Sequence, residues 1–157
     1  EAGGDLGLRP VGDRAIDSLR LEKGYGIWSA EFSTFYTAAQ SGLDRFIAWD
    51  KGDFAGRAAA LVERERGPKE RLVLLDIDSS DADAHGDEPV WHGDAVVGRV
   101  TSGSFGHHVQ RSLALAYVAT PLAVVEAVLE VSVMGRRRPA RVLPGAAFDP
   151  ENSRMRG

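Results

Sequence analysis

The sequence contains no cysteine. A chain without cysteine cannot form disulfide bonds, cannot hold a metal ion through thiolates and cannot use a cysteine nucleophile. The absence agrees with a reducing compartment, and we expect the protein in a bacterial cytoplasm or in an organelle matrix.

Long hydrophobic runs are also absent. No stretch of about 18 apolar residues occurs, and residues 1–10 have neither the basic start nor the apolar centre of a signal peptide. We therefore predict that the chain has no contact with a membrane. Because the first residue is not methionine and the opening is rich in glycine, we interpret the chain as part of a longer polypeptide.

The chain has no excess of positive charge. It has 19 Lys and Arg against 23 Asp and Glu, a formal net charge of −4. Binding to nucleic acid depends on clustered positive charge, and Arg136–Arg138 is a single basic triplet, which we expect at the tip of a hairpin. The sequence thus predicts no nucleic-acid partner.

Patterns that hold metals or phosphates are missing as well. The four histidines lack the spacing that zinc requires, and the acidic residues between 76 and 83 lack the glycine and terminal glutamate of a calcium loop. The glycine-rich stretch 101–106 follows a strand pattern, but no helix begins after it, so we interpret it as a hairpin turn and not as a phosphate cradle. We predict no metal site.

Two helices are expected in the first third of the chain. Residues 13–23 have helical periodicity, with Ala15, Ile16, Leu19 and Lys23 on one face, Asp13 as N-cap and Gly24 as the stop. A second helix should begin after an N-cap at Asp53, with Phe54, Ala58, Leu61 and Val62 on one face, and end at Gly67 and Pro68. Between them, residues 25–32 should be extended and residues 42–49 should form a strand.

The character of the sequence changes near residue 68. Six short runs rich in Val, Leu and Ile follow, separated by turn residues, a pattern typical of an antiparallel barrel or sandwich. The predicted strands cover 71–78, 88–91, 95–100, 112–118, 127–133 and 139–143. We expect an α+β segment over residues 1–67 and an all-β domain over residues 68–157.

The densest group of polar and aromatic residues is SLRLEKGYGIW, residues 18–28. Charged Arg20 and Glu22 near a helix end, followed by aromatic Tyr25 and Trp28 on an extended segment, could hold a flat polar ring. The alternative from spacing alone is that the charged pair lies on the surface or in an ion pair, while the two aromatics belong to the core.

This segment resembles the S-L-R-L-E-K-G-Y-x-x-W segment of the glycine-cleavage aminomethyltransferase superfamily, in the version found in dimethylglycine and sarcosine dehydrogenases. Residues 41–61, 86–118 and 148–157 also resemble the family, in the family's order. Ile16 stands where plain aminomethyltransferases often have arginine, and Gln40 stands where the family often has an acidic residue. Both departures favour the dehydrogenase branch.

The resemblance implies the end of a folate-binding domain over residues 1–67 and a small six-stranded antiparallel β-barrel over residues 68–157. It implies tetrahydrofolate as cofactor, with FAD only in a separate upstream domain, and folate and the remainder of the parent chain or another subunit as partners. Arg20 would bind the charged tail of folate or support an ion pair, and Glu22 would hold Arg20 or a backbone amide. Tyr25 and Trp28 would form cleft walls.

The same resemblance places the catalytic aspartate upstream, so we predict no catalytic residue in these 157 residues. The chain would be the C-terminal part of a tetrahydrofolate-dependent aminomethyl-transfer enzyme. Two alternatives remain open from the sequence: a non-catalytic docking module of a multidomain dimethylglycine or sarcosine dehydrogenase, or part of a folate-dependent demethylase.

Overall fold

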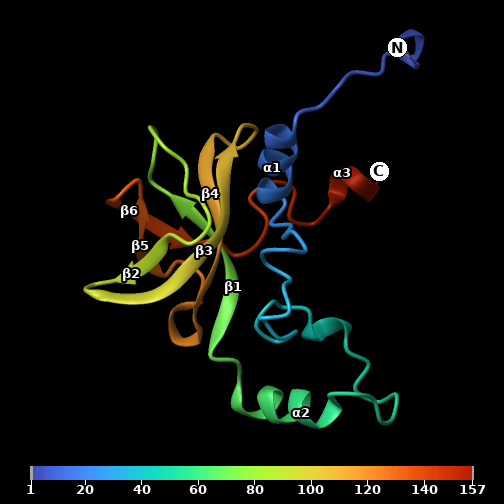
Figure 1. The fold of residues 1–157 in the computed structure, drawn as a ribbon, viewed down its shortest axis with the longest axis vertical. Coiled ribbons are helices and arrows are strands. Elements are labelled where there is room, and N and C mark those ends of the chain that lie inside the picture. Colours follow the sequence, from blue (N-terminus) through green and yellow to red (C-terminus); the bar gives the residue numbers. More distant parts are fainter. Residues whose placement is uncertain (1, 157) are drawn as a thin grey trace.

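The computed structural model describes residues 2–156, and Figure 1 shows a β-barrel preceded by a mainly helical and irregular segment. The helices are α1 (Asp13–Glu22), α2 (Arg57–Arg66) and α3 (Ser153–Arg156), with short 3₁₀ turns at Gly4–Leu6, Asp44–Phe46 and Thr120–Leu122. The strands are β1 (Glu70–Ile77), β2 (Pro89–His92), β3 (Ala95–Gly106), β4 (Arg111–Ala119), β5 (Val128–Val133) and β6 (Arg136–Val142).

The six strands close into an antiparallel barrel in the order β1-β4-β3-β2-β5-β6. The barrel closes where β6 pairs with β1, with Leu75 opposite Val142. All six predicted strands are confirmed, and of the two predicted architectures the structure is the barrel. Its interior is filled by small and β-branched side chains, which suit the narrow lumen of a small barrel.

Strand β4 is buried on both faces, which explains its continuous apolar sequence. Ala114, Ala116 and Val118 point into the barrel. Leu113 and Leu115 point outward and pack against Leu21 of α1. Strand β4 is thus the wall shared by the barrel and the helix.

Helix α1 ends as predicted, because Gly24 takes a left-handed conformation (φ 64°) that closes the last turn. The N–H of Tyr25 donates to the carbonyl of Arg20 (2.8 Å) and the N–H of Gly24 to that of Leu21 (2.9 Å), a Schellman cap. The predicted N-cap was wrong: Gly12 takes that position and Asp13 is already helical.

The predicted apolar face of α1 was also wrong. Ile16 and Leu19 are 52% and 60% exposed, whereas Ser18, Leu21 and Glu22 are buried. The reason is that α1 packs on the end of β3 and on the turn after it, where backbone N–H groups require polar acceptors.

Two predicted turns belong to strands. Residues 101–106 continue β3, which therefore runs to Gly106, and the hairpin turn comes after them. Arg136 pairs with Val133, so the arginine triplet lies in β6 and not at the tip. The tip is Met134-Gly135, because both residues have positive φ (50° and 75°), as a two-residue hairpin turn requires.

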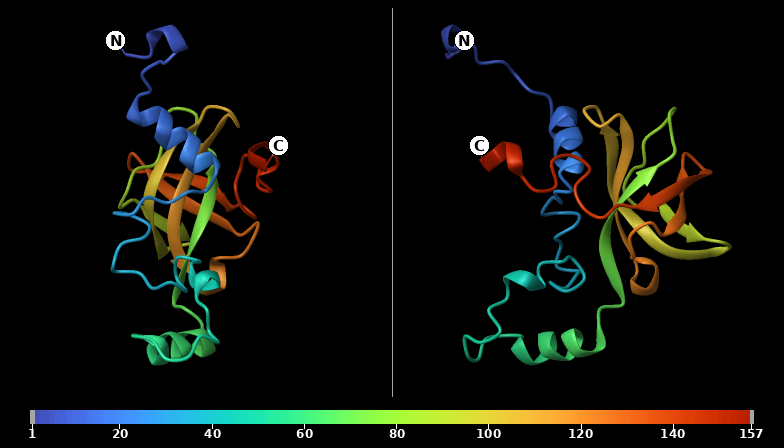
Figure 2. Two further views of the ribbon diagram at one scale, coloured as in Figure 1. Left: turned by 90° about the vertical axis from the view of Figure 1, so that its right-hand side faces the viewer. Right: turned by 180° about the vertical axis from the view of Figure 1, so that it is seen from behind.

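The region around α2 departs most from the sequence-based expectation. Residues 42–49 form turns and a 3₁₀ turn instead of a strand. Helix α2 begins after Gly56 (φ 84°), so Asp53 is not its N-cap, and none of its residues is buried. It ends at Gly67, as predicted. In both views of Figure 2, α2 lies apart from the barrel, and it contacts the irregular segment before it, where Trp49 packs against Arg64.

Within the described residues, no helix is both long and apolar enough to cross a membrane.

Candidate functional site

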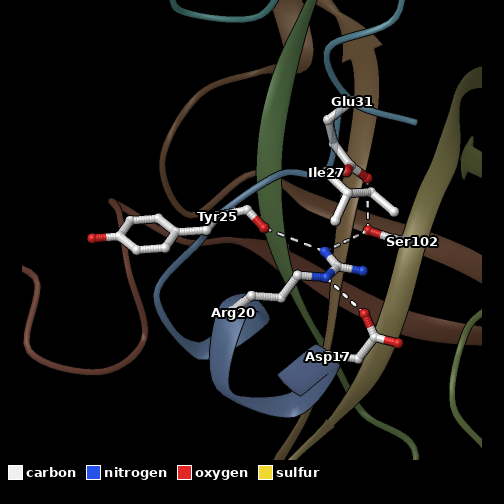
Figure 3. Close-up of polar contacts among 6 residues, drawn as sticks. All are labelled: Asp17, Arg20, Tyr25, Ile27, Glu31 and Ser102. Atoms are coloured by element: carbon white, nitrogen blue, oxygen red, sulfur yellow. Dashed lines mark hydrogen bonds and ion pairs between the residues drawn. The ribbon is translucent and has the colours of Figure 1, made fainter. Parts of the chain in front are cut away.

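Arg20 lies in the last turn of α1, where three groups hold its guanidinium in one orientation (Figure 3). Nε donates to Asp17 Oδ1 (2.7 Å), and Nη1 donates to Ser102 Oγ (3.1 Å) and to the carbonyl of Tyr25 (3.3 Å). The side chain is 11% exposed. Its second terminal nitrogen, Nη2, has no hydrogen-bond partner among residues 2–156 and remains a charged donor.

The network around Arg20 includes two residues that the sequence-based reasoning missed. Ser102 Oγ, from the middle of β3, donates to Glu31 Oε1 (2.6 Å), and Glu31 Oε2 accepts the N–H of Ile27 (2.7 Å). Ser102 is 9% exposed and Glu31 is fully buried. One weak signal was present: a glycine, Gly103, directly follows Ser102, and a glycine in a strand indicates close approach by another element.

Tyr25 and Trp28 follow α1 on the segment that Glu31 and Arg20 hold. Tyr25 is 50% exposed and Trp28 is 82% exposed. This contradicts the alternative that the two aromatics belong to the core. In Figure 3 the Tyr25 ring points away from the Arg20 network, whereas its carbonyl points into it. The segment therefore exposes two aromatic side chains, while its backbone is held by a fixed arginine.

The Glu22 side chain binds backbone N–H groups of the barrel. It is 2% exposed, and its Oε1 accepts the N–H groups of His108 (2.6 Å) and Val109 (3.2 Å) in the turn between β3 and β4. Gly106 permits this approach, because a Cβ there would lie 3.0 Å from Glu22 Cγ. Glu22 thus joins α1 to the barrel and makes no hydrogen bond to Arg20.

An aromatic pair continues the polar network on the outer face of β4. The rings of Tyr36 and Tyr117 stack with centroids 3.5 Å apart, and the Tyr117 hydroxyl donates to the carbonyl of Glu31 (2.7 Å). Burial raises the pKa of Tyr117, and the neighbouring Tyr36 raises it further. Tyr117 therefore stays a neutral hydrogen-bond donor throughout the neutral pH range.

A cavity of about 610 Å³ lies between residues 23–26 and 41–45 on one side and β1 with the residues that follow β6 on the other. Leu72, Leu74 and Leu143 belong to its apolar lining, and Lys23 and Arg45 contribute charge. Of the four predicted site residues, Tyr25 lines it. Tyr25 thus borders an open space whose lining is both apolar and charged.

The part of the chain that the structure describes holds no group of three or more His, Cys, Asp or Glu side chains suited to a metal ion. His107 and His108 lie in the turn after β3, where both are exposed.

Comparison with known proteins gives matches over both parts of the chain. Residues 70–149 match the glycine cleavage T-protein C-terminal barrel domain, and residues 1–51 match the GCVT N-terminal domain. Mitochondrial dimethylglycine dehydrogenase of Rattus norvegicus is 36% identical over 157 residues, covering 98% of this chain and 18% of its own length. The chain thus spans about a fifth of that relative.

An aminomethyltransferase of Synechocystis is 38% identical over 134 residues, which is 85% of this chain and 36% of that protein. The fold matches the crystal structure of glycine cleavage system aminomethyltransferase T from Bartonella henselae, with a TM-score of 0.86 at 24% identity. That match covers 94% of this chain and 42% of the other. The chain belongs to the glycine cleavage T-protein (aminomethyltransferase) family and is homologous to dimethylglycine dehydrogenase.

Proposed function

We propose that this chain takes part in tetrahydrofolate-dependent one-carbon (aminomethyl) transfer by forming part of the folate cleft. The observation that carries the proposal is the fixed guanidinium of Arg20 together with the exposed rings of Tyr25 and Trp28 on the segment that follows α1. In this proposal, residues 1–67 complete the folate-binding domain and residues 68–157 form the C-terminal barrel domain.

The chemistry of these residues fits a folate. Arg20 keeps the two N–H donors of Nη2 for a carboxylate or a ring carbonyl, and the aromatic faces of Tyr25 and Trp28 suit stacking against a flat ring. Tetrahydrofolate, when bound, supplies the nitrogen atoms that carry the one-carbon unit. The residues of this chain would bind and orient it, and we assign none of them a catalytic role.

We propose a supporting role for Glu22. Because its carboxylate already accepts two backbone N–H groups, it would hold α1 and the Arg20 side chain in register with the barrel.

One relative is mitochondrial and another is bacterial, which supports an organelle matrix or a bacterial cytoplasm as the compartment.

A tetrahydrofolate titration followed by tryptophan fluorescence tests the proposal. We expect a saturable change in the wild type, its loss in Trp28→Ala, and about tenfold weaker binding in Arg20→Lys, because lysine cannot keep the three contacts of the guanidinium. Trp49→Phe is the control, since Trp49 packs against Arg64 and takes no part in the network. If tetrahydrofolate at millimolar concentration changes nothing in the wild type, the proposal is wrong.

A second candidate function is a non-catalytic docking module of a multidomain dimethylglycine or sarcosine dehydrogenase, or of a folate-dependent demethylase. The observation that favours it is the exposed apolar surface of the first part of the chain, where Leu19, Trp28, Phe35 and Phe46 are 60–90% exposed. Under this alternative, Phe35→Ser and Phe46→Ser would weaken assembly with the rest of the enzyme, while Arg20→Lys would leave tetrahydrofolate affinity unchanged.

A further inference from the structure

Glu31 is a fully buried acid that the proposed folate contacts do not include. Both carboxylate oxygens and the carbonyl of Glu31 accept hydrogen bonds: Oε1 accepts from Ser102, Oε2 accepts from the N–H of Ile27, and the carbonyl accepts from Tyr117 (2.6, 2.7 and 2.7 Å). A buried carboxylate is costly unless it is hydrogen-bonded and electrically compensated. The hydrogen bonds that compensate the buried Glu31 carboxylate therefore also fix the groups that donate them.

Ser102 joins this acid to Arg20. Its hydroxyl accepts a hydrogen bond from Arg20 Nη1 and donates its own proton to Glu31, so one hydroxyl connects the positive and negative groups (Figure 3). The two charged side chains come from segments on either side of Tyr25. The arginine fixes the carbonyl of Tyr25, and Glu31 fixes the N–H of Ile27.

The backbone between these two anchors is also packed closely. A Cβ placed on Gly26 would lie 2.7 Å from Glu31 Cβ and 2.9 Å from the Phe32 ring. Glycine is thus required where the segment turns over the acid. Tyr25 and Trp28, one residue before and two residues after Gly26, are both exposed and have no such packing of their own.

We propose that Glu31 is a positioning residue: through the N–H of Ile27 and through Ser102, it sets the conformation of residues 25–28 and the orientation of Arg20. It does so without touching the ligand, because it is fully buried. The functional part of this inference rests on the proposed folate site. The conformational part concerns this chain alone.

A purely structural role is the competing explanation, and the barrel contains a matched pair for comparison. Ser112, 1% exposed on β4, donates to Asp83 Oδ1 (3.0 Å), so it is also a buried serine bound to a carboxylate. Neither residue contacts the Arg20 network. Substitutions there should lower stability without changing residues 25–28.

The experiment uses the full-length protein labelled with 5-fluorotryptophan, in which the ¹⁹F resonance of Trp28 is identified by its absence in Trp28→Phe. We expect Glu31→Gln and Ser102→Ala to shift or broaden the Trp28 resonance without ligand, and to weaken tetrahydrofolate binding about tenfold. The matched variants, Asp83→Asn and Ser112→Ala, should lower the melting temperature and leave both the resonance and the affinity unchanged.

The inference is overturned if the Trp28 resonance is the same in the wild type and both network variants. If the resonance moves but the wild type does not bind tetrahydrofolate, positioning of the segment stands and the proposed folate function fails. If Glu31→Gln does not fold, Ser102→Ala decides, because it removes the link and leaves Glu31 its backbone partner.

Discussion

The barrel and the segment before it use opposite means to hold their structure. In the barrel, the interior is lined by fully buried aliphatic side chains such as Leu75, Val100 and Val131. Among residues 2–67, Leu21 is the one buried hydrophobic side chain, while Glu22 and Glu31 are buried and polar. The barrel is therefore stabilised by apolar packing, and the preceding segment by hydrogen bonds to the outer face of the barrel.

This difference has a consequence for function. A segment fixed by a few directional hydrogen bonds leaves its aromatic side chains available to a ligand or a neighbouring domain, whereas a segment fixed by packing would bury them. Arg20, Tyr25 and Trp28 lie in this segment, next to the barrel but outside its core. The rigid barrel thus serves as the support for a small polar and aromatic surface.

The largest effect should come from the barrel core. Leu75 is fully buried, so Leu75→Ala should lower the free energy of unfolding by about 2–5 kcal/mol, from lost burial and the cavity left behind. Val62→Ala on α2, where the side chain is 45% exposed, should change it by less than about 0.5 kcal/mol. Urea unfolding followed by circular dichroism measures both. Equal losses would contradict the comparison of the two regions.

The next effect concerns the junction of α1 with the barrel. Glu22→Ala removes the acceptor for the N–H groups of His108 and Val109, and should cost about 2 kcal/mol because both are left unpaired. Hydrogen exchange of these two amides should accelerate, while exchange in β5, on the far side of the barrel, stays slow. Unchanged protection at His108 and Val109 would show that Glu22 does not join the two regions.

A smaller effect should follow from the outer face of β4. Tyr117→Phe keeps the ring that stacks on Tyr36 but removes the donor to the carbonyl of Glu31, at a cost of about 1 kcal/mol. Tyr25→Phe is the control for stability, since that ring is half exposed and should change the free energy of unfolding by less than about 0.5 kcal/mol. If Tyr117→Phe leaves the free energy of unfolding unchanged, packing alone holds the segment on β4.

The smallest effect should be pH-dependent and involves the C-terminal end of the described chain. Hydrogen bonds from Ser153 and Arg154, with the nearby charge of Lys23, hold the pKa of Asp149 below its ordinary value. The charged form is therefore favoured in the folded state. Its stabilising contribution is present above the unfolded pKa of about 3.9 and is lost as the pH falls through the lower folded pKa.

Comparison of wild type with Asp149→Asn isolates this contribution. We expect the wild type to have the higher melting temperature at pH 6, and the two proteins to converge as the pH falls through the lowered pKa of Asp149 in the folded state. Lys23→Met should reduce the difference, because Lys23 Nζ lies 3.6 Å from Asp149 Oδ2. A difference that stays constant down to acid pH would assign the effect to hydrogen-bond geometry and not to charge.

Much of the architecture followed from local patterns. Short runs rich in Val, Leu and Ile, separated by turn residues, identified all six strands. Gly24 and Gly67 marked the ends of the two longer helices, because backbone conformation at such positions depends on the residue itself. The predictions failed where contacts with residues distant in the sequence decide the backbone conformation. Residues 101–106 look like a turn because of their glycines, yet those glycines allow α1 and the loop around Ala84 to approach β3.

The candidate site likewise combines residues that a local pattern indicates with residues that only tertiary contacts bring in. The segment 18–28 could be singled out from its residue types, but Ser102 and Glu31, which complete its network, are 82 residues and 11 residues away from Arg20 along the chain. Gly103 beside Ser102 indicates a close approach but names no partner, and a lone glutamate in a loop carries no pattern. Their contact exists only because α1 lies across β3.

The sequence by itself determined the barrel strands, the two longer helices and the group of residues from Ser18 to Trp28, since periodicity and helix-ending glycines are local properties. Tertiary structure alone decided which face of α1 is buried, that Glu22 binds a turn and not Arg20, and that Glu31 and Arg20 share one serine. The physical reason is that polar side chains are satisfied by partners distant in sequence, and only the folded chain brings those partners within hydrogen-bond distance.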